Sequence, residues 1–554
     1  MLRPNARCPV VSRPPHGRLL LIGEWWSERS LLEATARDLK PLGLCRSLTT
    51  DGWGRYIALP ISERGEVCGV FRDPSGSLDA FVISLPDVTV IASEPHAWLL
   101  PDLRPALTID WTRVGDMVAD TTVVSGRSAL AGAIAVTPGE FRPLDPAETA
   151  TTLWHPGSIP RRHQRKIHTA QRELAEVIDR TVGVLADSAG RLMVEVSGGL
   201  DSAIIAASVQ GLKRAEPPTL INYFGPHAEA DERGFAWEVA ALSGVPLMTV
   251  ARPDPAGVAQ GWAQDRLSFR PGFVRLDSDY DRAQAELARS AQADAVLTGK
   301  GGDAVLFQHA TPLVFADLWQ DHPVRAPFDR ALVDVARWCR MSVWQVLAEA
   351  RRANTRAIPE RLAGRPPLAF ANRELTAQTC HPWLEDIGDT PPAKQIQIAA
   401  IASNLGLHGP SPQTDVVEVR HPLLMQPVVE TVLALPTYGL TQSGRDRGLA
   451  RQAFAGRIPA RIQARRTKGG LAHYFADAIV EGLDQLRPFL MDGLLAQHAL
   501  LDRDRLELAL SADTLIWNAV YGDIMLLTMI EAWCRRWTEA LGGDGIVAER
   551  VVEP

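Results

Sequence analysis

Residues 194–202 read Val-Glu-Val-Ser-Gly-Gly-Leu-Asp-Ser, an apolar run that leads directly into a turn containing two glycines. The run predicts a buried strand, and the apolar residues after the turn predict a helix. Gly198 and Gly199 have no Cβ atom, so backbone N–H groups can approach an anion there. Ser197 and Ser202 add hydroxyl donors, and the N-terminus of the helix would face the same anion. This order predicts a phosphate-binding loop. The simpler alternative is a turn in which Ser or Asp caps the helix.

A second stretch supports a nucleotide site. Asp201 would repel a polyphosphate unless a divalent cation lay between them, so it is a candidate Mg²⁺ ligand. Residues 295–303 read Ala-Val-Leu-Thr-Gly-Lys-Gly-Gly-Asp, again a short strand that enters a glycine turn and ends in a carboxylate. In one parallel sheet Asp201 and Asp303 would project from the same edge and could hold a metal against a triphosphate. Gly301 and Gly302 are candidate phosphate-binding residues, unless the turn is only a glycine-rich loop with Asp as helix cap.

The remaining sequence predicts two domains. Residues 1–145 contain short apolar runs between turn residues, which predicts a β-rich domain. Residues 146–165 are interpreted as a linker, although a lid or an ordered connector also fits their composition. Residues 166–554 alternate predicted helices and strands, which indicates an α/β fold with a parallel sheet that becomes mainly helical after about residue 310. Strands are expected at 18–22, 55–61, 67–71, 80–84, 88–92, 192–196, 220–224 and 247–250, and helices at 232–242, 331–354, 394–405 and 514–537.

Composition narrows the class of protein. The chain of 554 residues has 58 Lys and Arg against 65 Asp and Glu, a net charge of −7, which argues against nucleic acid as a partner. The six cysteines have no metal-binding spacing and are expected to be reduced structural thiols. We find no signal peptide and no apolar run of membrane-spanning length, which predicts a cytoplasmic protein without a membrane span.

Several motifs together resemble the synthetase domain of the asparagine synthetase superfamily, over roughly residues 165–480. This resemblance implies a PP-loop ATP pyrophosphatase fold in which a carboxylate attacks the α-phosphorus of ATP, AMP and pyrophosphate are released, and an amine completes an amide bond. ATP and Mg²⁺ are the implied cofactors, and Asp201 and Asp303 match the Mg²⁺ ligands of the family. The matching stretches are residues 197–202, 231–232, 299–303, 418–424, 451–454, 458–459 and 466–469.

Two further residues gain candidate catalytic roles from this resemblance. Lys468 matches a lysine that stabilises charge during the reaction, although by itself it could be a surface cation. Glu418 matches a carboxylate that belongs to a base-assisting pair in β-lactam synthetase, although it could also pair with Arg420 in a structural turn. The sequence departs from the family at Lys300 and Ala304, where acidic neighbours of the second motif are usual.

The N-terminal region indicates which branch of the superfamily the chain resembles. Glutamine-dependent members need a Cys directly after the initiator Met, and this sequence has Leu2 there, with Cys8 further along, so glutaminase activity is not expected. Residues 53–58, 70–76 and 91–94 resemble the degenerate N-terminal-nucleophile-hydrolase-like domain of lasso peptide cyclases.

The resemblance to these cyclases implies adenylation of an Asp or Glu side chain in a short peptide, followed by attack of the N-terminal amine of the peptide to close a macrolactam ring. A precursor or core peptide substrate, a leader peptidase and a leader-recognition protein are the implied partners.

Three alternatives remain open from the sequence. The first is a small-molecule amide synthetase, either ring-closing like β-lactam synthetase or ammonia-dependent like some asparagine synthetases. The second is a catalytically silent scaffold, against which the presence of Asp201, Asp303 and Lys468 argues. The third is a glutamine-dependent amidotransferase, which Leu2 disfavours.

Overall fold

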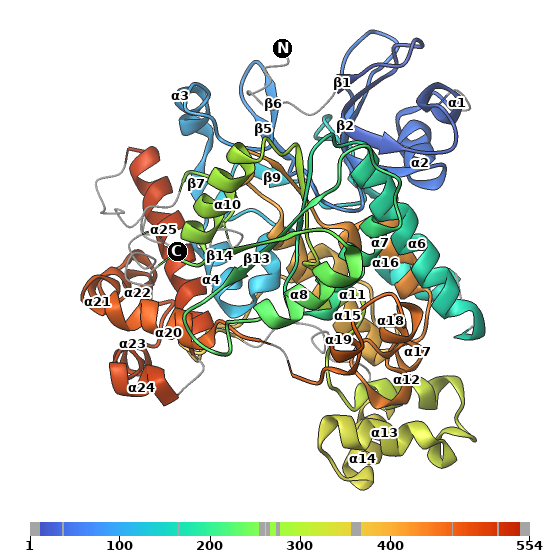
Figure 1. Ribbon diagram of the computed structural model, residues 1–554. Helices are drawn as coiled ribbons and strands as arrows, with labels where there is room; N and C mark the ends of the chain where they lie inside the picture. Colours follow the sequence, from blue (N-terminus) through green and yellow to red (C-terminus); the bar gives the residue numbers. More distant parts are fainter. Residues whose placement is uncertain are drawn as a thin grey trace.

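A computed structural model describes residues 11–35, 38–162, 167–253, 261, 266–272, 277–355, 367–467, 469–517 and 520–542. Three residues discussed above, Leu2, Cys8 and Lys468, lie outside this described part. The fold combines antiparallel sheets near the N-terminus with a parallel sheet and many helices, as Figure 1 shows. No helix among the described residues combines the length and the apolar character that crossing a bilayer requires.

Among the described residues of the N-terminal region, the two larger antiparallel sheets pack face to face. Along β2, Leu19 and Leu21 join a core beneath helix α2, while Leu20 and Ile22 face the second sheet, as the two-residue period of a strand requires. The larger sheet has the strand order β1 (Val11–Ser12), β2 (Leu19–Trp26), β3 (Trp53–Pro60), β4 (Gly69–Arg72), β10 (Glu140–Pro143) and β11 (Thr151–Thr152). The smaller has the order β6 (Thr89–Ala92), β5 (Phe81–Ser84) and β9 (Ala133–Ala135), and α2 spans Pro41–Thr50.

The segment 146–165, interpreted above as a linker, includes a strand of the larger sheet. Strand β11 pairs with β10 in the register Glu140↔Thr152, so the antiparallel sheet ends beyond residue 145. The backbone of Gly139 also accepts hydrogen bonds from the N–H groups of Leu153 and Trp154. Residues 151–152 of this segment are therefore part of the antiparallel sheet, and the predicted domain boundaries stay a prediction.

The parallel sheet forms the centre of the second region. Its strand order is β14 (Leu247–Ala251), β13 (Thr219–Phe224), β12 (Leu192–Glu195), β15 (Ala295–Leu297) and β16 (Glu418–Arg420), and all neighbours are parallel. Along the chain, β13 and β14 are added on one side of β12, and β15 and β16 are then added on its other side. The boundary between β12 and β15 is thus a topological switch point, the place where open parallel sheets bind ligands beyond the carboxyl ends of their strands.

Helices cover both faces of this sheet. Leu192 and Val194 share a core with residues of α6 (Ile167–Asp187), α7 (Leu200–Gln210) and α8 (Arg233–Ser243). Met193, on the opposite face, packs with Ile221 and with Ala285 of α10 (Ser278–Ser290). Both faces of β12 are therefore buried, which explains its nearly continuous apolar sequence.

Two of the long helices expected from sequence are divided in the structure. The expected helix 331–354 consists of α13 (Arg330–Cys339) and α14 (Val343–Thr355), because Arg340 adopts a left-handed conformation with φ 54° and ends α13. The expected helix 514–537 corresponds to α24 (Ala512–Trp517) and α25 (Tyr521–Ala540). The apolar periodicity continues across such breaks, so it does not locate them.

The C-terminal helices pack against the N-terminal region. Leu103, Met117 and Phe81 share one hydrophobic core with Trp533 and other residues of α25. Figure 1 shows α25, in red, beside α4 (Trp111–Ala119) and β7 (Thr108–Ile109) in blue. The two ends of the chain are therefore joined by a common core.

Candidate functional site

The first glycine loop lies between β12 and α7 and is closed by its own serines. The hydroxyl of Ser202 accepts a hydrogen bond of 3.0 Å from the backbone N–H of Ser197. The hydroxyl of Ser197 lies 3.0 Å from that of Ser202 and accepts from the N–H of Gly199 at 3.1 Å. Gly199 is the N-cap of α7, and none of the described side chains caps that helix. The N-terminal N–H groups of α7 are thus not satisfied by a Ser or Asp cap, and they suit an anion.

The second loop, residues 298–303, packs directly on the first. A Cβ atom on Gly299 would lie 2.4 Å from the backbone nitrogen of Ser202, and one on Gly302 would lie 2.4 Å from Cγ of Asp201. Gly301, with φ 85°, is the N-cap of the short helix α11 (Gly302–Val305) that carries Asp303. These glycines therefore allow an approach of the two loops that any larger residue would prevent.

A buried histidine anchors the second loop. The hydroxyl of Thr298 accepts a hydrogen bond from the N–H of Lys300 at 3.1 Å and lies 2.8 Å from Nδ1 of His421. Burial lowers the pKa of His421 well below its ordinary value, and the nearby His408 and Lys300 lower it further. The ring is therefore neutral near pH 7 and serves the loop as a hydrogen-bond partner.

One arginine joins the two predicted metal ligands. Nη1 of Arg447 lies 2.7 Å from Oδ2 of Asp201 and 2.5 Å from Oδ1 of Asp303. Burial disfavours the charge on Arg447, but Asp201, Asp303 and Asp446 together raise its pKa above the ordinary value. A single positively charged atom is thus held between both carboxylates. The same point suits a divalent cation whose remaining ligands come from phosphate and water.

The backbone of Arg447 is held in an unusual conformation. Its φ of 51° is left-handed, and its N–H donates to the carbonyl of Phe307, which is also left-handed with φ 68°. Such conformations cost free energy for residues with a side chain and are concentrated at functional sites. Our sequence reasoning missed Arg447. The available signal was its place four positions before Arg451, in an arginine-rich stretch that leads into the matched segment 451–454.

A second carboxylate–arginine group connects the first loop to residues 465–469. Glu232 accepts hydrogen bonds from the N–H of Gly198 at 3.1 Å and from the N–H of Gly469 at 3.0 Å. Nη1 of Arg465 donates to Glu232 at 2.6 Å and to the carbonyl of Gly198 at 2.8 Å. The backbone next to Lys468 is therefore tied to the phosphate loop. The catalytic role of Lys468 itself stays a prediction, because that residue lies outside the described part of the chain.

Glu418 lies away from these loops. It begins β16, opposite Ala295 at the amino end of the sheet, whereas the loops leave from the carboxyl end. Its Oε2 accepts from Nε of Arg420 at 2.9 Å and lies 3.5 Å from Nη2 of Arg55 on β3. These contacts agree with the alternative in which Glu418 pairs with Arg420 in a structural role. A catalytic role for Glu418 stays a prediction.

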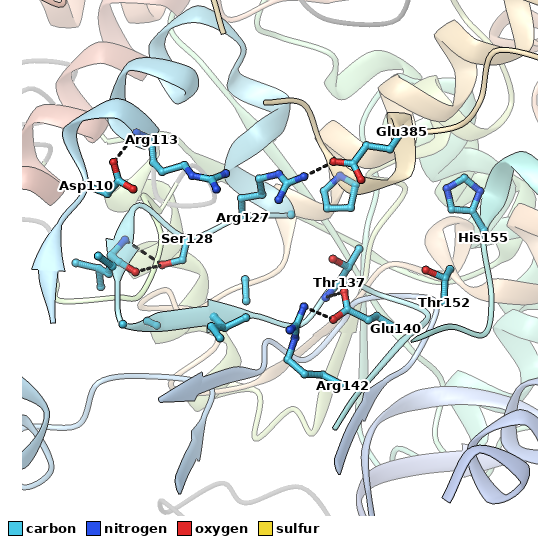
Figure 2. Close-up of a pocket in the computed structure, with 18 of the residues that line it drawn as sticks. Asp110, Arg113, Arg127, Ser128, Thr137, Glu140, Arg142, Thr152, His155 and Glu385 are labelled. Carbon is cyan, nitrogen blue, oxygen red and sulfur yellow. Dashed lines mark hydrogen bonds and ion pairs between the residues drawn. The ribbon is translucent and has the colours of Figure 1, made fainter. Parts of the chain in front are cut away.

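The N-terminal region contains a separate cavity of about 780 Å³. It is bounded by β9 and β11, which are edge strands, and by residues 382–386. Figure 2 shows Arg127 directed at Glu385 and Arg142 beside Glu140. Nη2 of Arg142 lies 2.6 Å from Oε1 of Glu140. None of the residues of the two glycine loops lines this cavity. Its charged groups are largely paired with one another, so it favours no ligand of a single charge sign.

Replacement of Gly299 by Ala is expected to separate the two loops. The new methyl group would contact backbone atoms of Asp201 and Ser202, which cannot rotate away. We expect a loss of about 1–3 kcal/mol in nucleotide affinity or stability, as is typical of overpacking. Titration of the protein with an ATP analogue and thermal unfolding measure the two effects. Gly234→Ala, in α8 with no atom near the added methyl group, is the matched control. Equal affinity of both variants would contradict the close packing of the loops.

Replacement of Arg447 by Met is expected to leave Asp201 and Asp303 without their shared cation. Removal of one partner of a buried ion pair costs on the order of 3 kcal/mol. Mg²⁺ without nucleotide should then raise the melting temperature of the variant more than that of the wild type, because the cation replaces the guanidinium.

Arg451→Met is the control for this comparison. Arg451 is also buried but binds Asp446 and backbone carbonyls rather than the two carboxylates. The Arg451→Met variant should be less stable than the wild type, and Mg²⁺ should not raise its melting temperature more than that of the wild type. The same response to Mg²⁺ in both variants would show that Arg447 does not hold the position of a metal ion.

Comparison with known proteins agrees with this geometry. None of the curated proteins matches the chain significantly. The family model described as "Asparagine synthase" matches residues 173–535, more than half of the chain and a range that includes both loops, Glu232 and Arg447. Members of that family are ligases that form amide bonds with ATP, typically together with Mg²⁺. This chain therefore belongs to the asparagine synthase family.

Proposed function

We propose that this protein is an ATP-dependent lasso peptide cyclase that closes a macrolactam ring. A side-chain carboxylate of Asp or Glu in the core peptide attacks the α-phosphorus of ATP, and pyrophosphate leaves with the bonding electron pair. The N-terminal amine of the peptide then attacks the acyl carbon, AMP leaves, and the amine loses a proton. The observation that carries the proposal is the convergence of Asp201 and Asp303 on one cation position beside the uncapped N-terminus of α7.

Each part of the site has a role in this reaction. The N-terminus of α7 and the serine hydroxyls bind the phosphates, and the packed glycine loops fix where those phosphates lie. Mg²⁺ held by Asp201 and Asp303 would neutralise charge on the phosphates when bound. Glu232 and Arg465 hold the backbone beside Lys468 against the first loop, which would bring this lysine to the charge that develops during adenylation.

Cys45 in helix α2 and Cys68, directly before β4, support an amine source other than glutamine. Cys45 is fully buried, and burial raises the pKa of its thiol well above the ordinary value. Burial also raises the pKa of Cys68, whose thiol donates to the carbonyl of Pro60. Hydrolytic cysteines need the opposite, a lowered pKa that favours the thiolate. Neither residue has the properties of a glutaminase nucleophile, so the amine is assigned to the substrate.

Mass spectrometry of a linear core peptide incubated with purified protein, ATP and Mg²⁺ tests the proposal. We expect the peptide to lose the mass of one water while an equal amount of AMP forms. Asp201→Asn and Lys468→Ala should each abolish both products, because one removes a metal ligand and the other the predicted stabilising cation. Asp187→Asn, an exposed carboxylate at the end of α6, is the control that should retain activity.

The other outcomes separate the alternative functions. Full turnover by the Asp201 or Lys468 variant would remove that residue from the mechanism. AMP formation without a change in the peptide would favour a small-molecule amide synthetase, the second candidate, which would use the same loops. If neither AMP nor cyclised peptide forms, the result would favour a silent scaffold.

Replacement of Cys8 by Ala is expected to leave ring closure unchanged, because the proposed reaction uses no cysteine nucleophile. The initial rates of AMP formation by the variant and by the wild type should agree within experimental error. A normally folded variant without activity would mean that the N-terminal region contributes a thiol to catalysis.

A further inference from the structure

A buried polar cluster lies on the face of the parallel sheet that α10 covers, at the carboxyl end of the strands. Met193 and Ile221 pack on α10, so Glu195 and Tyr223, two residues further along β12 and β13, project from the same face. Asp277 at the N-cap of α10 and Asp281 in its first turn approach them from the helix. We name these four residues the α10 cluster.

Aromatic and ionic contacts hold the cluster together and join it to the second glycine loop. The hydroxyl of Tyr280 donates to Oε1 of Glu195 at 2.6 Å, and its ring meets that of Tyr223 edge-on at 4.6 Å between centroids. The guanidinium of Arg252 lies 4.4 Å from the centroid of the Tyr280 ring and pairs with Asp277. Nζ of Lys300, from the second loop, lies 5.7 Å from the same centroid.

The cluster contains buried acceptor atoms that the described protein does not satisfy. Oε2 of Glu195, Oδ1 of Asp277 and Oδ2 of Asp281 are buried, and none has a hydrogen-bond partner among the described residues. Asp281 as a whole is only 3% exposed. An unsatisfied buried polar group costs about 1–3 kcal/mol, more if it is charged, so each such group calls for an explanation. A ligand that supplies donors is one such explanation.

The charges indicate what kind of donor is missing. Three carboxyl groups face two cations, Arg252 and Lys300, so the cluster has an excess of negative charge when all three are ionised. Burial raises the pKa of Asp281 to about 7, with Lys300 opposing that rise and Asp277 and Glu195 adding to it. No three His, Cys, Asp or Glu side chains of the described residues are grouped so as to hold a metal ion. A ligand that complements these unpartnered carboxylate oxygens is an organic cation with N–H donors.

We infer that the α10 cluster binds the protonated primary amine of the acceptor substrate, and this inference rests on the amide-forming function proposed above. An ammonium group has N–H donors for buried carboxylate oxygens of this cluster and offsets the excess charge. The cluster adjoins Lys300, which lies between Gly299 and Gly301 of the loop that carries Asp303. The amine would thus be held at the sheet edge where the carboxylate is activated.

Binding of n-butylammonium to the full-length protein, measured by saturation-transfer NMR, tests this inference without any turnover. The wild type should bind this cation saturably and should not bind n-butanol, its uncharged analogue. Glu195→Gln and Asp281→Asn should each weaken the binding at least tenfold, because they keep the shape of the side chain but remove its charge. Tyr223→Phe, which removes only a hydroxyl, should weaken it less, and it provides a variant with minimal risk to folding. Glu286→Gln, an exposed carboxylate on the same helix, should bind like the wild type.

Several results would overturn the inference. They are an absence of saturable binding by the wild type, equal binding of n-butylammonium and n-butanol, or unchanged binding by folded Glu195 and Asp281 variants. The main rival ligand is the amino group of the adenine base, and a parallel titration with AMP tests whether the cluster binds it. If Glu195→Gln weakens AMP binding and leaves n-butylammonium binding intact, the cluster recognises the nucleotide instead. Because no peptide or ATP hydrolysis enters this test, its failure is distinguishable from failure of the cyclase assay.

Discussion

The contact between two glycine loops at the carboxyl edge of the parallel sheet is the constraint on which the rest of the site depends. Strands β12 and β15 are hydrogen-bonded neighbours, so the loops that follow them emerge about 5 Å apart. At that separation there is no room for a Cβ atom at Gly299 or Gly302. The glycines therefore bring Asp201 and Asp303 within reach of one cation.

The close approach of two carboxylates creates an electrostatic problem that other segments solve. Like charges at this distance repel each other, and the burial of Asp201 is costly without a partner. Arg447 supplies the compensating charge from a loop far along the chain, and Arg465 does the same for Glu232. The site is consequently complete only when the segment around residues 445–469 has folded onto the sheet.

The two faces of the sheet differ in their chemistry. On the face covered by α7, helix N–H groups and hydroxyls suit an anion, and on the face covered by α10, carboxylate oxygens that have no partner in the described part of the chain suit a cation. Formation of an amide from a phosphate-activated carboxylate and an amine needs both kinds of binding at one place. The N-terminal sheets support both parts of the chain, because Phe81 of the smaller sheet shares a core with the C-terminal helices, and Trp26 and Trp53 of the larger sheet pack against the core of the second region.

The sequence alone determined the local parts of this protein. Strand and helix periodicity predicted β12, β13, β14 and the N-terminal strands. The burial of one or both faces of an element sets the spacing of its apolar residues along the sequence. The glycine turns and their carboxylates were likewise visible, since these backbone conformations restrict the residue types allowed.

Only the tertiary structure decided which distant groups meet. The ion-pair partners of Arg447 and Glu232 are not visible in the sequence, because an ion pair depends on the path of the chain between its partners and not on neighbouring residues. For the same reason the sequence could not choose between a catalytic and a structural place for Glu418, which the structure pairs with Arg420, or show the buried carboxylates beneath α10.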